Sequence, residues 1–278
     1  MSSAESAVVL AEFELAPVGG EPGTSRVAVV ITLSRPDCLN AIDWEMLRQL
    51  DSTIDALSDR EDLCCVLVTG AGRAFSAGGD LKGYIELQRD SVAFPQFVSD
   101  IHRVFGRLRE LPVPVVALVN GVTAAGGLEL LLNCDLALVA RSARIGDGHL
   151  NFGQMGGGGV LTLLPRVVGL QRASELIFSG RFLSSEEAVD WGLAIRCVDD
   201  EALLESGLTF AREVAAKSPL ALANAKAVLQ GLWATNGDLT SGLQVERERN
   251  DVYCLTSEDA PEGLHAFLEK RPPRFHGR

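Results

Sequence analysis

The sequence lacks the features of membrane-spanning and secreted proteins. No apolar run reaches the length of about 18 residues that a membrane-spanning helix needs. Residues 1–6 carry no basic region ahead of an apolar stretch, so we expect no secretory signal. The cysteines show no C-x-x-C pair and no regular spacing; they are Cys38, Cys64, Cys65, Cys134, Cys197 and Cys254. We therefore expect a cytoplasmic protein with reduced thiols, without a disulfide framework or a metal site.

Positive charge is also scarce. The chain has 25 Lys and Arg against 37 Asp and Glu, which gives a net charge of −12. Such a surface repels nucleic acid, so we expect no DNA or RNA partner, although a phosphorylated small molecule needs only a local basic patch. Internal repeats, coiled-coil heptads and low-complexity segments are missing as well. At 278 residues and 47% hydrophobic content, the chain can form one large domain, or a core with a small appendage.

Short apolar runs alternate with amphipathic segments over the first two thirds of the chain. The runs predict strands at Val8–Leu15, Val27–Leu33, Cys64–Thr69, Val115–Val119, Leu136–Ala140 and Ala194–Val198. Helical spacing of apolar residues predicts helices over about 44–58, 92–110 and 126–134. This alternation favours an α/β fold built from parallel βαβ units.

The chain is mostly helical after a glycine-rich loop at 145–159. Apolar spacing predicts helices over about 160–167, 171–179, 185–191, 201–217, 219–232, 239–256 and 258–269. We therefore expect an α/β core over residues 1–198, of which 1–7 form a loose tail, and a helical C-terminal region over residues 199–278.

Two glycine-centred segments each directly follow a strand-like run. They are Ala74–Lys82 (AFSAGGDLK) and Ala124–Leu130 (AAGGLEL). Each can end a buried strand and present backbone N–H groups at a site. The first has no G-K-[ST] ending and no G-x-G-x-x-G that opens a helix, which disfavours a Walker or Rossmann phosphate site. A plain turn that needs positive φ remains the alternative.

The second segment opens an apolar helix and contains Glu129. A helix N-terminus has unpaired N–H groups and attracts an oxyanion, and here Gly126 and Gly127 stand at that position. Glu129 is surrounded by leucines, so burial should raise its pKa and make it a candidate acid or base. A first-turn glutamate that only complements the helix dipole is the alternative, and the residues alone leave both interpretations open.

Four ordered segments resemble the enoyl-CoA hydratase/isomerase superfamily, also called the crotonase family. Residues 34–41 resemble its early coenzyme A-binding segment, 74–82 its A-G-x-D segment, 120–130 its second oxyanion segment and 257–275 its closing signature. The resemblance covers nearly the whole chain. It implies a crotonase-like ββα superhelical core, with a helical C-terminal region over 199–278 that assembles homotrimers or dimers of trimers, which are homohexamers.

The resemblance also implies roles for individual residues. The backbone N–H groups of Gly79 and Gly126 would hold the thioester carbonyl oxygen and stabilise an enolate. Coenzyme A would enter as part of the thioester substrate, with no prosthetic group. Its expected contacts are Cys38, Leu39, Ala41, Ala74, Ser76, Ala77, Gly79, Asp80, Leu81, Lys82, Gly126 and Lys270. Lys270 would reach the nucleotide, if necessary from a neighbouring subunit; an ordinary surface lysine is the alternative.

The sequence departs from the hydratase pattern at the second catalytic glutamate. An ungapped match anchored on Gly146 and Gly153 places His149 there. Asp147 and Asn151 lie two residues to either side, so all three could share one side of an extended segment. Histidine has an unperturbed pKa near 6.5, and Glu129 with His149 is therefore a workable pair for adding water. A mere positioning or loop role for His149 is the alternative.

These features favour hydration or dehydration of a 2-enoyl-CoA. The alternatives are isomerisation of a double bond, hydrolysis or C–C cleavage of an unusual acyl-CoA, or a non-catalytic binding role. We expect the acyl pocket to use residues of segment 82–97, including Tyr84, Ile85, Leu87 and Phe94, and of the C-terminal helices, including Trp233. No motif identifies the acyl group.

Overall fold

Two β-sheets form the centre of the molecule. The computed structural model describes residues 6–15, 25–235 and 238–278. The larger sheet has the order β1-β2-β3-β5-β7-β10 and the smaller one β4-β6-β8-β9. The larger sheet consists of β1 (Val8–Leu15), β2 (Arg26–Leu33), β3 (Leu63–Gly70), β5 (Val115–Val119), β7 (Leu136–Ala140) and β10 (Arg196–Val198). The smaller consists of β4 (Ala74–Ser76), β6 (Val122–Ala124), β8 (Arg144–Gly146) and β9 (Leu183–Ser184).

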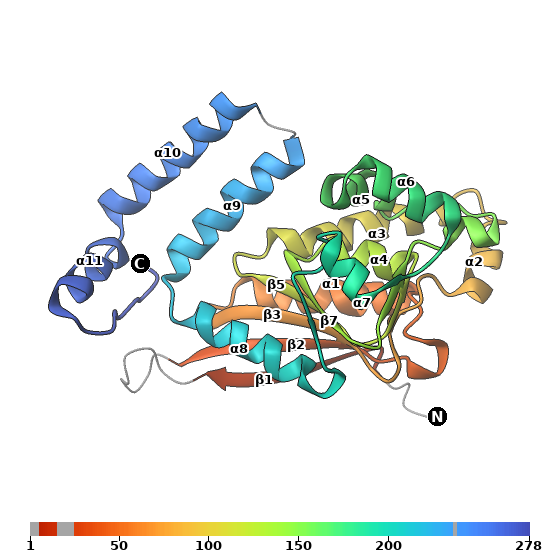
Figure 1. The fold of residues 1–278 in the computed structure, drawn as a ribbon, viewed down its shortest axis with the longest axis horizontal. Coiled ribbons are helices and arrows are strands. Elements are labelled where there is room, and N and C mark those ends of the chain that lie inside the picture. Colours follow the sequence, from red (N-terminus) through yellow and green to blue (C-terminus); the bar gives the residue numbers. More distant parts are fainter. Residues whose placement is uncertain (1–5, 16–24, 236–237) are drawn as a thin grey trace.

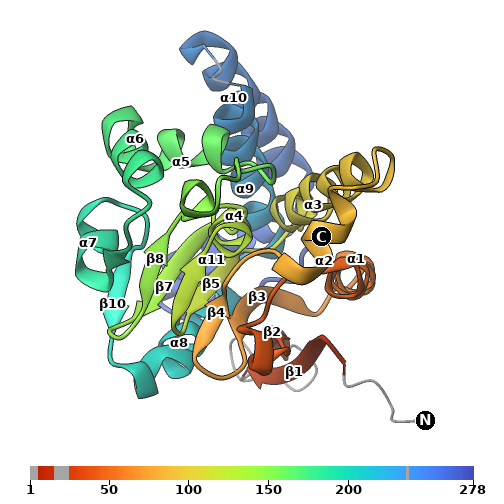
Figure 2. The same ribbon diagram turned by 90° about the vertical axis from the view of Figure 1, so that its right-hand side faces the viewer.

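Strands of the two sheets follow one another in pairs along the chain. The pairs β3–β4, β5–β6 and β7–β8 each place one strand in each sheet, and a helix follows each pair. Pairing is parallel except between β1 and β2 and between β8 and β9. Figure 2 shows the strands between α5, α6 and α7 on one side and α1, α2 and α3 on the other. This is the expected α/β fold with repeated ββα units.

Helices cover both faces of the larger sheet (Figure 1). On one face lie α1 (Trp44–Ser58) and α3 (Ala93–Glu110), whose apolar sides are buried. Asp43 caps α1 by accepting a hydrogen bond from the Met46 N–H at 2.8 Å. On the other face, α8 (Leu203–Ala215) packs so closely that a Cβ on Gly207 would lie 2.9 Å from Leu118. Each large side chain buried in these layers contributes about 1.5–3 kcal/mol.

Short helices connect the strands near the smaller sheet. They are α2 (Leu81–Leu87), α4 (Gly126–Leu131), α5 (Val160–Val168), α6 (Leu170–Ser179) and α7 (Ser185–Asp190). The 3-10 turns within the described ranges are η2 (Pro36–Cys38), η3 (His149–Phe152) and η4 (Asp200–Ala202). The first glycine segment, Ala74–Lys82, contains β4 and the start of α2, which are too short to leave a periodic signal in the sequence.

The last three helices extend from the core in Figure 1. They are α9 (Pro219–Thr235), α10 (Leu239–Thr256) and α11 (Asp259–Glu269). An ion pair of 2.7 Å between Lys226 and Asp135 ties α9 to the core. In the described part of the chain, no helix is both long and apolar enough to cross a membrane.

Of the tail expected over residues 1–7, residues 1–5 lie outside the described part of the chain. Ala7 does not belong to a loose tail: its side chain is buried, and its carbonyl accepts a hydrogen bond of 2.8 Å from the Ser34 N–H.

Candidate active site

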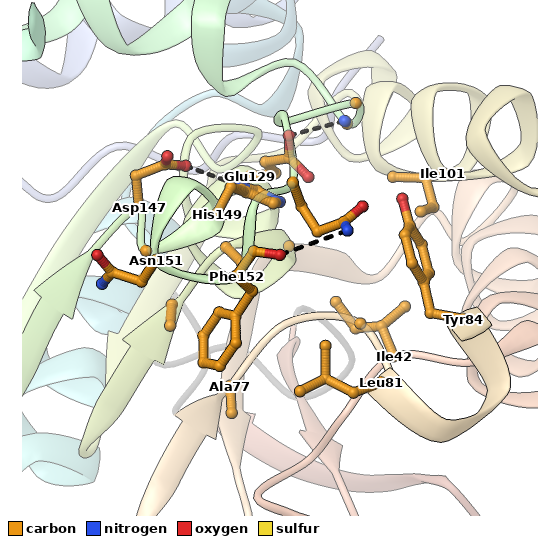
Figure 3. A pocket seen from close by; sticks show the side chains of 18 of the residues that line it. Ile42, Ala77, Leu81, Tyr84, Ile101, Glu129, Asp147, His149, Asn151 and Phe152 are labelled. Carbon is orange, nitrogen blue, oxygen red and sulfur yellow. Dashed lines mark hydrogen bonds and ion pairs between the residues drawn. The ribbon is translucent and has the colours of Figure 1, made fainter. Parts of the chain in front are cut away.

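Both glycine segments border one cavity of about 360 Å³. Figure 3 looks into it, with Tyr84 and Ile101 on one side and Asp147 and His149 on the other. Gly79 and Gly126 line it together with Glu129. Most of the remaining wall is apolar and includes Ile42, Leu81, Phe97, Val98, Phe152 and Phe182. An apolar cavity with a few converging polar groups is the usual form of a small-molecule site.

The two glycine segments meet because β4 and β6 pair in parallel. A Cβ built on Gly126 would lie 3.6 Å from the Gly79 nitrogen, so the two backbones are close neighbours. Neither N–H group donates a hydrogen bond to another residue in the described ranges. Gly126 is the first residue of α4, where the helix itself offers its N–H no partner. The arrangement supplies two adjacent donors that a carbonyl oxygen could accept.

Backbone contacts fix the position of each donor. On the first side, the Ile42 N–H donates to the Gly78 carbonyl at 2.8 Å and the Asp80 N–H to the Ile42 carbonyl at 3.0 Å. On the second side, Ala125 adopts a φ of 49° immediately before Gly126. That conformation is rare for a residue with a Cβ, and such strain concentrates at functional sites. The Ala125 N–H is held by the Asp147 carbonyl at 2.8 Å.

Glu129 is a buried carboxylate on α4. Only 2% of the residue is exposed. Its Oε1 accepts hydrogen bonds from the Gly158 N–H at 2.7 Å and from the Val160 N–H at 3.2 Å. Burial raises the pKa of Glu129, although the nearby His149 and the two N–H groups act in the opposite direction. A carboxylate with a raised pKa is a stronger base, as proton abstraction requires.

His149 and Asp147 form a second polar group beside Glu129. The His149 Nδ1 lies 2.7 Å from an Asp147 Oδ1, and the two side chains are 15% and 1% exposed. Burial lowers the pKa of His149, but the hydrogen bond and charge of Asp147 and the charge of Glu129 outweigh it, so the net direction is upward. Figure 3 shows Asp147 pointing at the His149 ring next to Glu129.

The segment around His149 is not extended. Gly148 has a φ of 68°, and His149 begins the 3-10 turn η3. Asn151 lines the cavity, but its amide Nδ2 donates to the Gly180 carbonyl at 2.8 Å. The structure thus joins Asp147 to His149 and ties Asn151 to the end of α6. An extended segment would instead have placed all three side chains on the same side.

The expected coenzyme A contacts fall into two groups. Four of them line the cavity, namely Ala77, Gly79, Leu81 and Gly126. The others among the N-terminal contacts do not line it, and they are Cys38, Leu39, Ala41, Ala74, Ser76, Asp80 and Lys82. Several of these residues make hydrogen bonds or ion pairs that hold the edge of the cavity in place.

Three contacts illustrate how the rim is built. The Leu39 carbonyl accepts from the Ala77 N–H at 2.9 Å, and the buried Ser76 hydroxyl donates to the Asn40 carbonyl at 2.9 Å. Asp80 caps α2 and forms an ion pair of 3.1 Å with Arg35. The rim of the cavity is therefore fixed by residues of both the 34–41 and 74–82 segments.

Lys270 lies away from the cavity within one chain. It follows the last turn of α11, and α11 and α2 stand at opposite ends of the molecule in Figure 1. Trp233, expected in the acyl pocket, lies instead beneath the Arg109 guanidinium at 5.0 Å. Of the side chains expected from segment 82–97, Tyr84 lines the cavity, whereas Ile85, Leu87 and Phe94 do not.

Sequence reasoning missed the contribution of Ile101 and of the glycine run 156–159. Ile101 has the spacing of a core residue, yet it lines the cavity from α3 together with Phe97, which falls within the expected segment 82–97. Gly158 holds Glu129 through its N–H, and a Cβ there would collide with the Glu129 Oε2. Four successive glycines were the available signal, because such a run indicates that the backbone approaches another group closely.

Comparison with known proteins defines the class of the molecule. The fold matches the crystal structure of an enoyl-CoA hydratase from Bacillus anthracis with a TM-score of 0.88 and 31% identity, over 98% of this chain and 100% of that one. This agreement confirms the crotonase fold with its helical C-terminal region. A model of the enoyl-CoA hydratase/isomerase family matches residues 23–278. The chain therefore belongs to the enoyl-CoA hydratase/isomerase family and is an enzyme of that family.

Relatives in the family carry the names of different reactions. The chain is 36% identical to the mitochondrial methylglutaconyl-CoA hydratase of Mus musculus, over 91% of this chain and 81% of the relative. It is 35% identical to the 1,2-epoxyphenylacetyl-CoA isomerase of Escherichia coli, over 90% and 95%. The family thus establishes an acyl-CoA enzyme and leaves the reaction to be inferred from the site.

Proposed function

We propose that the protein adds water to a 2-enoyl-CoA thioester or removes water from the corresponding 3-hydroxyacyl-CoA. The observation that carries this proposal is the meeting of two kinds of group in one cavity. Gly79 and Gly126 provide paired N–H donors, and Glu129 and His149 provide two groups that exchange protons. Hydration needs both kinds, because charge develops on the carbonyl oxygen while one proton leaves water and another reaches carbon.

We assign the steps as follows. The thioester oxygen accepts hydrogen bonds from Gly79 and Gly126. The Glu129 carboxylate takes a proton from water while the water oxygen bonds to C3 and the electron pair moves to the thioester oxygen as an enolate. The His149 imidazolium then gives a proton to C2 as the carbonyl re-forms. Glu129 keeps one oxygen for this task, since the bonds from Gly158 and Val160 go to Oε1.

Isomerisation is the second candidate function. It is favoured by the isomerase name of a relative that matches 90% of this chain. One carboxylate can move a proton between C2 and C4 of an enolate without any water. Hydrolysis or C–C cleavage of an unusual acyl-CoA would use a water activated by His149.

One experiment separates these reactions. Purified protein is incubated with crotonyl-CoA and with a 3-enoyl-CoA, and the products are analysed by mass spectrometry. Hydration adds the mass of one water molecule, isomerisation leaves the mass unchanged, and hydrolysis releases free coenzyme A. We expect hydration of the 2-enoyl substrate. If Glu129→Gln left every activity of the panel unchanged, the catalytic assignment of Glu129 would be refuted.

We propose further that the active form is a homotrimer or a dimer of trimers in the cytoplasm. The support is the set of large apolar side chains exposed on α10 and α11, which are Leu239, Leu243, Val245, Val252, Leu255, Leu264, Phe267 and Leu268. A monomeric protein rarely leaves so many large apolar side chains exposed on adjacent helices. Assembly would also offer a route by which Lys270 of a neighbouring copy could reach the nucleotide.

A further inference from the structure

Asp147 is a buried carboxylate with two separate ties to the site. Its side chain meets the His149 ring at 2.7 Å from Nδ1 to Oδ1. Its main-chain carbonyl accepts the Ala125 N–H at 2.8 Å, directly before the oxyanion donor Gly126. The residue is 1% exposed, and a buried carboxylate is found where a partner compensates for its lost hydration.

We propose that Asp147 is a positioning residue that holds His149 with its proton on Nδ1 and leaves Nε2 to exchange protons with the substrate. This inference rests on the proposed function, in which His149 supplies the proton to C2. Asp147 itself touches neither substrate nor reacting atoms in this scheme. Its side chain acts only through the orientation, tautomer and charge of the ring.

The geometry favours this role over a direct partnership with Glu129. An ionised carboxylate only accepts hydrogen bonds, so Asp147 at Nδ1 requires the ring to donate there. In the described part of the chain, Asp147 is bonded to the ring and shares no hydrogen bond with the Glu129 carboxylate, which is held by Gly158 and Val160 instead. A buried carboxylate that orients a histidine through Nδ1 is also the arrangement that lets Nε2 work as acid or base in other enzymes.

The charged groups facing the ring come from two elements. Asp147 belongs to the segment before η3, and Glu129 comes from α4. Both favour the imidazolium. Removal of the Asp147 charge alone must therefore make the ring easier to deprotonate, while the Glu129 contribution remains.

The kinetic test uses Asp147→Asn, which preserves the shape of the side chain but not its charge. We expect kcat to fall about 10- to 100-fold with little change in KM, as for other groups that orient a functional histidine. The protonated ring is the working form, so activity falls as pH rises through its pKa. This alkaline limb should move to lower pH in the variant. A loss of kcat without movement of the limb would overturn the proposal, because a purely structural role predicts that result.

Asn151→Ala is the matched control. Asn151 belongs to η3, as His149 does, and its amide donates a hydrogen bond to the Gly180 carbonyl; among the described residues it makes no hydrogen bond to the ring. We expect its alkaline limb to coincide with that of the wild type, whatever its effect on stability. An equal shift in both variants would mean that loosening of η3, rather than the Asp147 charge, moves the limb, and this would contradict the proposal.

A spectroscopic test on the wild-type protein needs no turnover. The chain has only 4 histidines, so ¹⁵N-histidine labelling gives few ring signals, and His149→Gln assigns the one in question. At alkaline pH the nitrogen shifts of wild-type His149 should indicate a proton on Nδ1. A neutral ring protonated on Nε2 would overturn the positioning role. If the protein hydrated no enoyl-CoA yet showed the Nδ1–H form, the proposed function would fail while the ring geometry stood.

Discussion

At the scale of the residue, Glu129 connects the fold to the chemistry. Its Oε1 is fixed by two N–H groups and its burial raises its pKa. We expect Glu129→Gln to lower kcat about 10²- to 10⁴-fold, because the amide keeps the shape and cannot take a proton. Steady-state kinetics on the substrate identified by mass spectrometry, with circular dichroism as the check on folding, measures this. A variant with more than half of the wild-type kcat would contradict it.

The same substitution has a predictable effect on stability. A carboxyl group whose pKa is raised in the folded state contributes stability that is complete below its unfolded pKa and is lost as pH rises through the folded pKa. Burial raises the pKa of Glu129, so the wild type loses this contribution above the ordinary value of 4.5. The amide of the Glu129→Gln variant carries no charge to desolvate. Near pH 8 the variant should therefore be more stable by about 1 kcal/mol or more, a common exchange of function for stability.

Urea unfolding at several pH values checks this prediction. The difference in the free energy of unfolding between variant and wild type should shrink as pH falls towards the unfolded pKa of the carboxyl group. A variant less stable than the wild type near pH 8 would mean that the hydrogen bonds to Oε1 outweigh the desolvation of the charge.

At the scale of the element, the loop between η3 and α5 determines where Glu129 points. Gly158 contacts the carboxylate so closely that a Cβ would collide with its Oε2 and lie 2.8 Å from Ile101. We expect Gly158→Ala to lower kcat at least about 10-fold, since a small displacement of a catalytic group is costly. The matched variant is Gly157→Ala, whose Cβ would have its nearest contact 3.3 Å away, at Val98.

Steady-state kinetics and thermal unfolding of both variants test this prediction. Gly157→Ala should lose distinctly less kcat than Gly158→Ala at a similar melting temperature. Equal losses in the two variants would show that the loop tolerates no added methyl group anywhere, and the specific link between Gly158 and Glu129 would be wrong.

The lengths of the elements also explain which of them could be predicted from the sequence. The continuous apolar run Val115–Val119 and the periodic pattern of α3 predict their structures well, because a fully buried strand is apolar throughout and a helix buried on one side repeats its apolar residues with the helical period. The strands β4, β6, β8 and β9 have two or three residues, too few for any period. Their pairing is what brings the two glycine segments together, so the segments could be found in the sequence while their contact could not.

The same limit applies within the site. His149 could be found by its place relative to Gly146 and Gly153, and Glu129 by its apolar neighbours. The bond from Gly158 to Glu129 joins residues 29 positions apart, and no local pattern encodes such a contact. The turn at Gly148, with its positive φ, likewise separates Asn151 from the Asp147–His149 pair in a way that spacing alone does not predict.

At the scale of the whole molecule, the C-terminal helices carry apolar side chains that the chain itself does not cover. Leu255 and Phe267 are 84% and 81% exposed on α10 and α11. Burying such side chains against another copy would stabilise an assembly by about 1.5–3 kcal/mol for each one. We therefore expect Leu255→Asp combined with Phe267→Asp to weaken or abolish the proposed assembly, because each aspartate buried in its interface would lack a partner.

Light scattering coupled to size-exclusion chromatography measures the mass at several protein concentrations. Val92→Asp is the matched control. Val92 is similarly exposed, at 78%, but it lies at the start of α3, away from α10 and α11. The control should keep the wild-type mass, whereas the double variant should elute with the 29.7 kDa mass of one chain. A double variant that keeps the wild-type mass would place the interface elsewhere. A wild type that is itself monomeric would remove assembly as the route for Lys270 to the nucleotide, because one chain holds that residue far from the cavity.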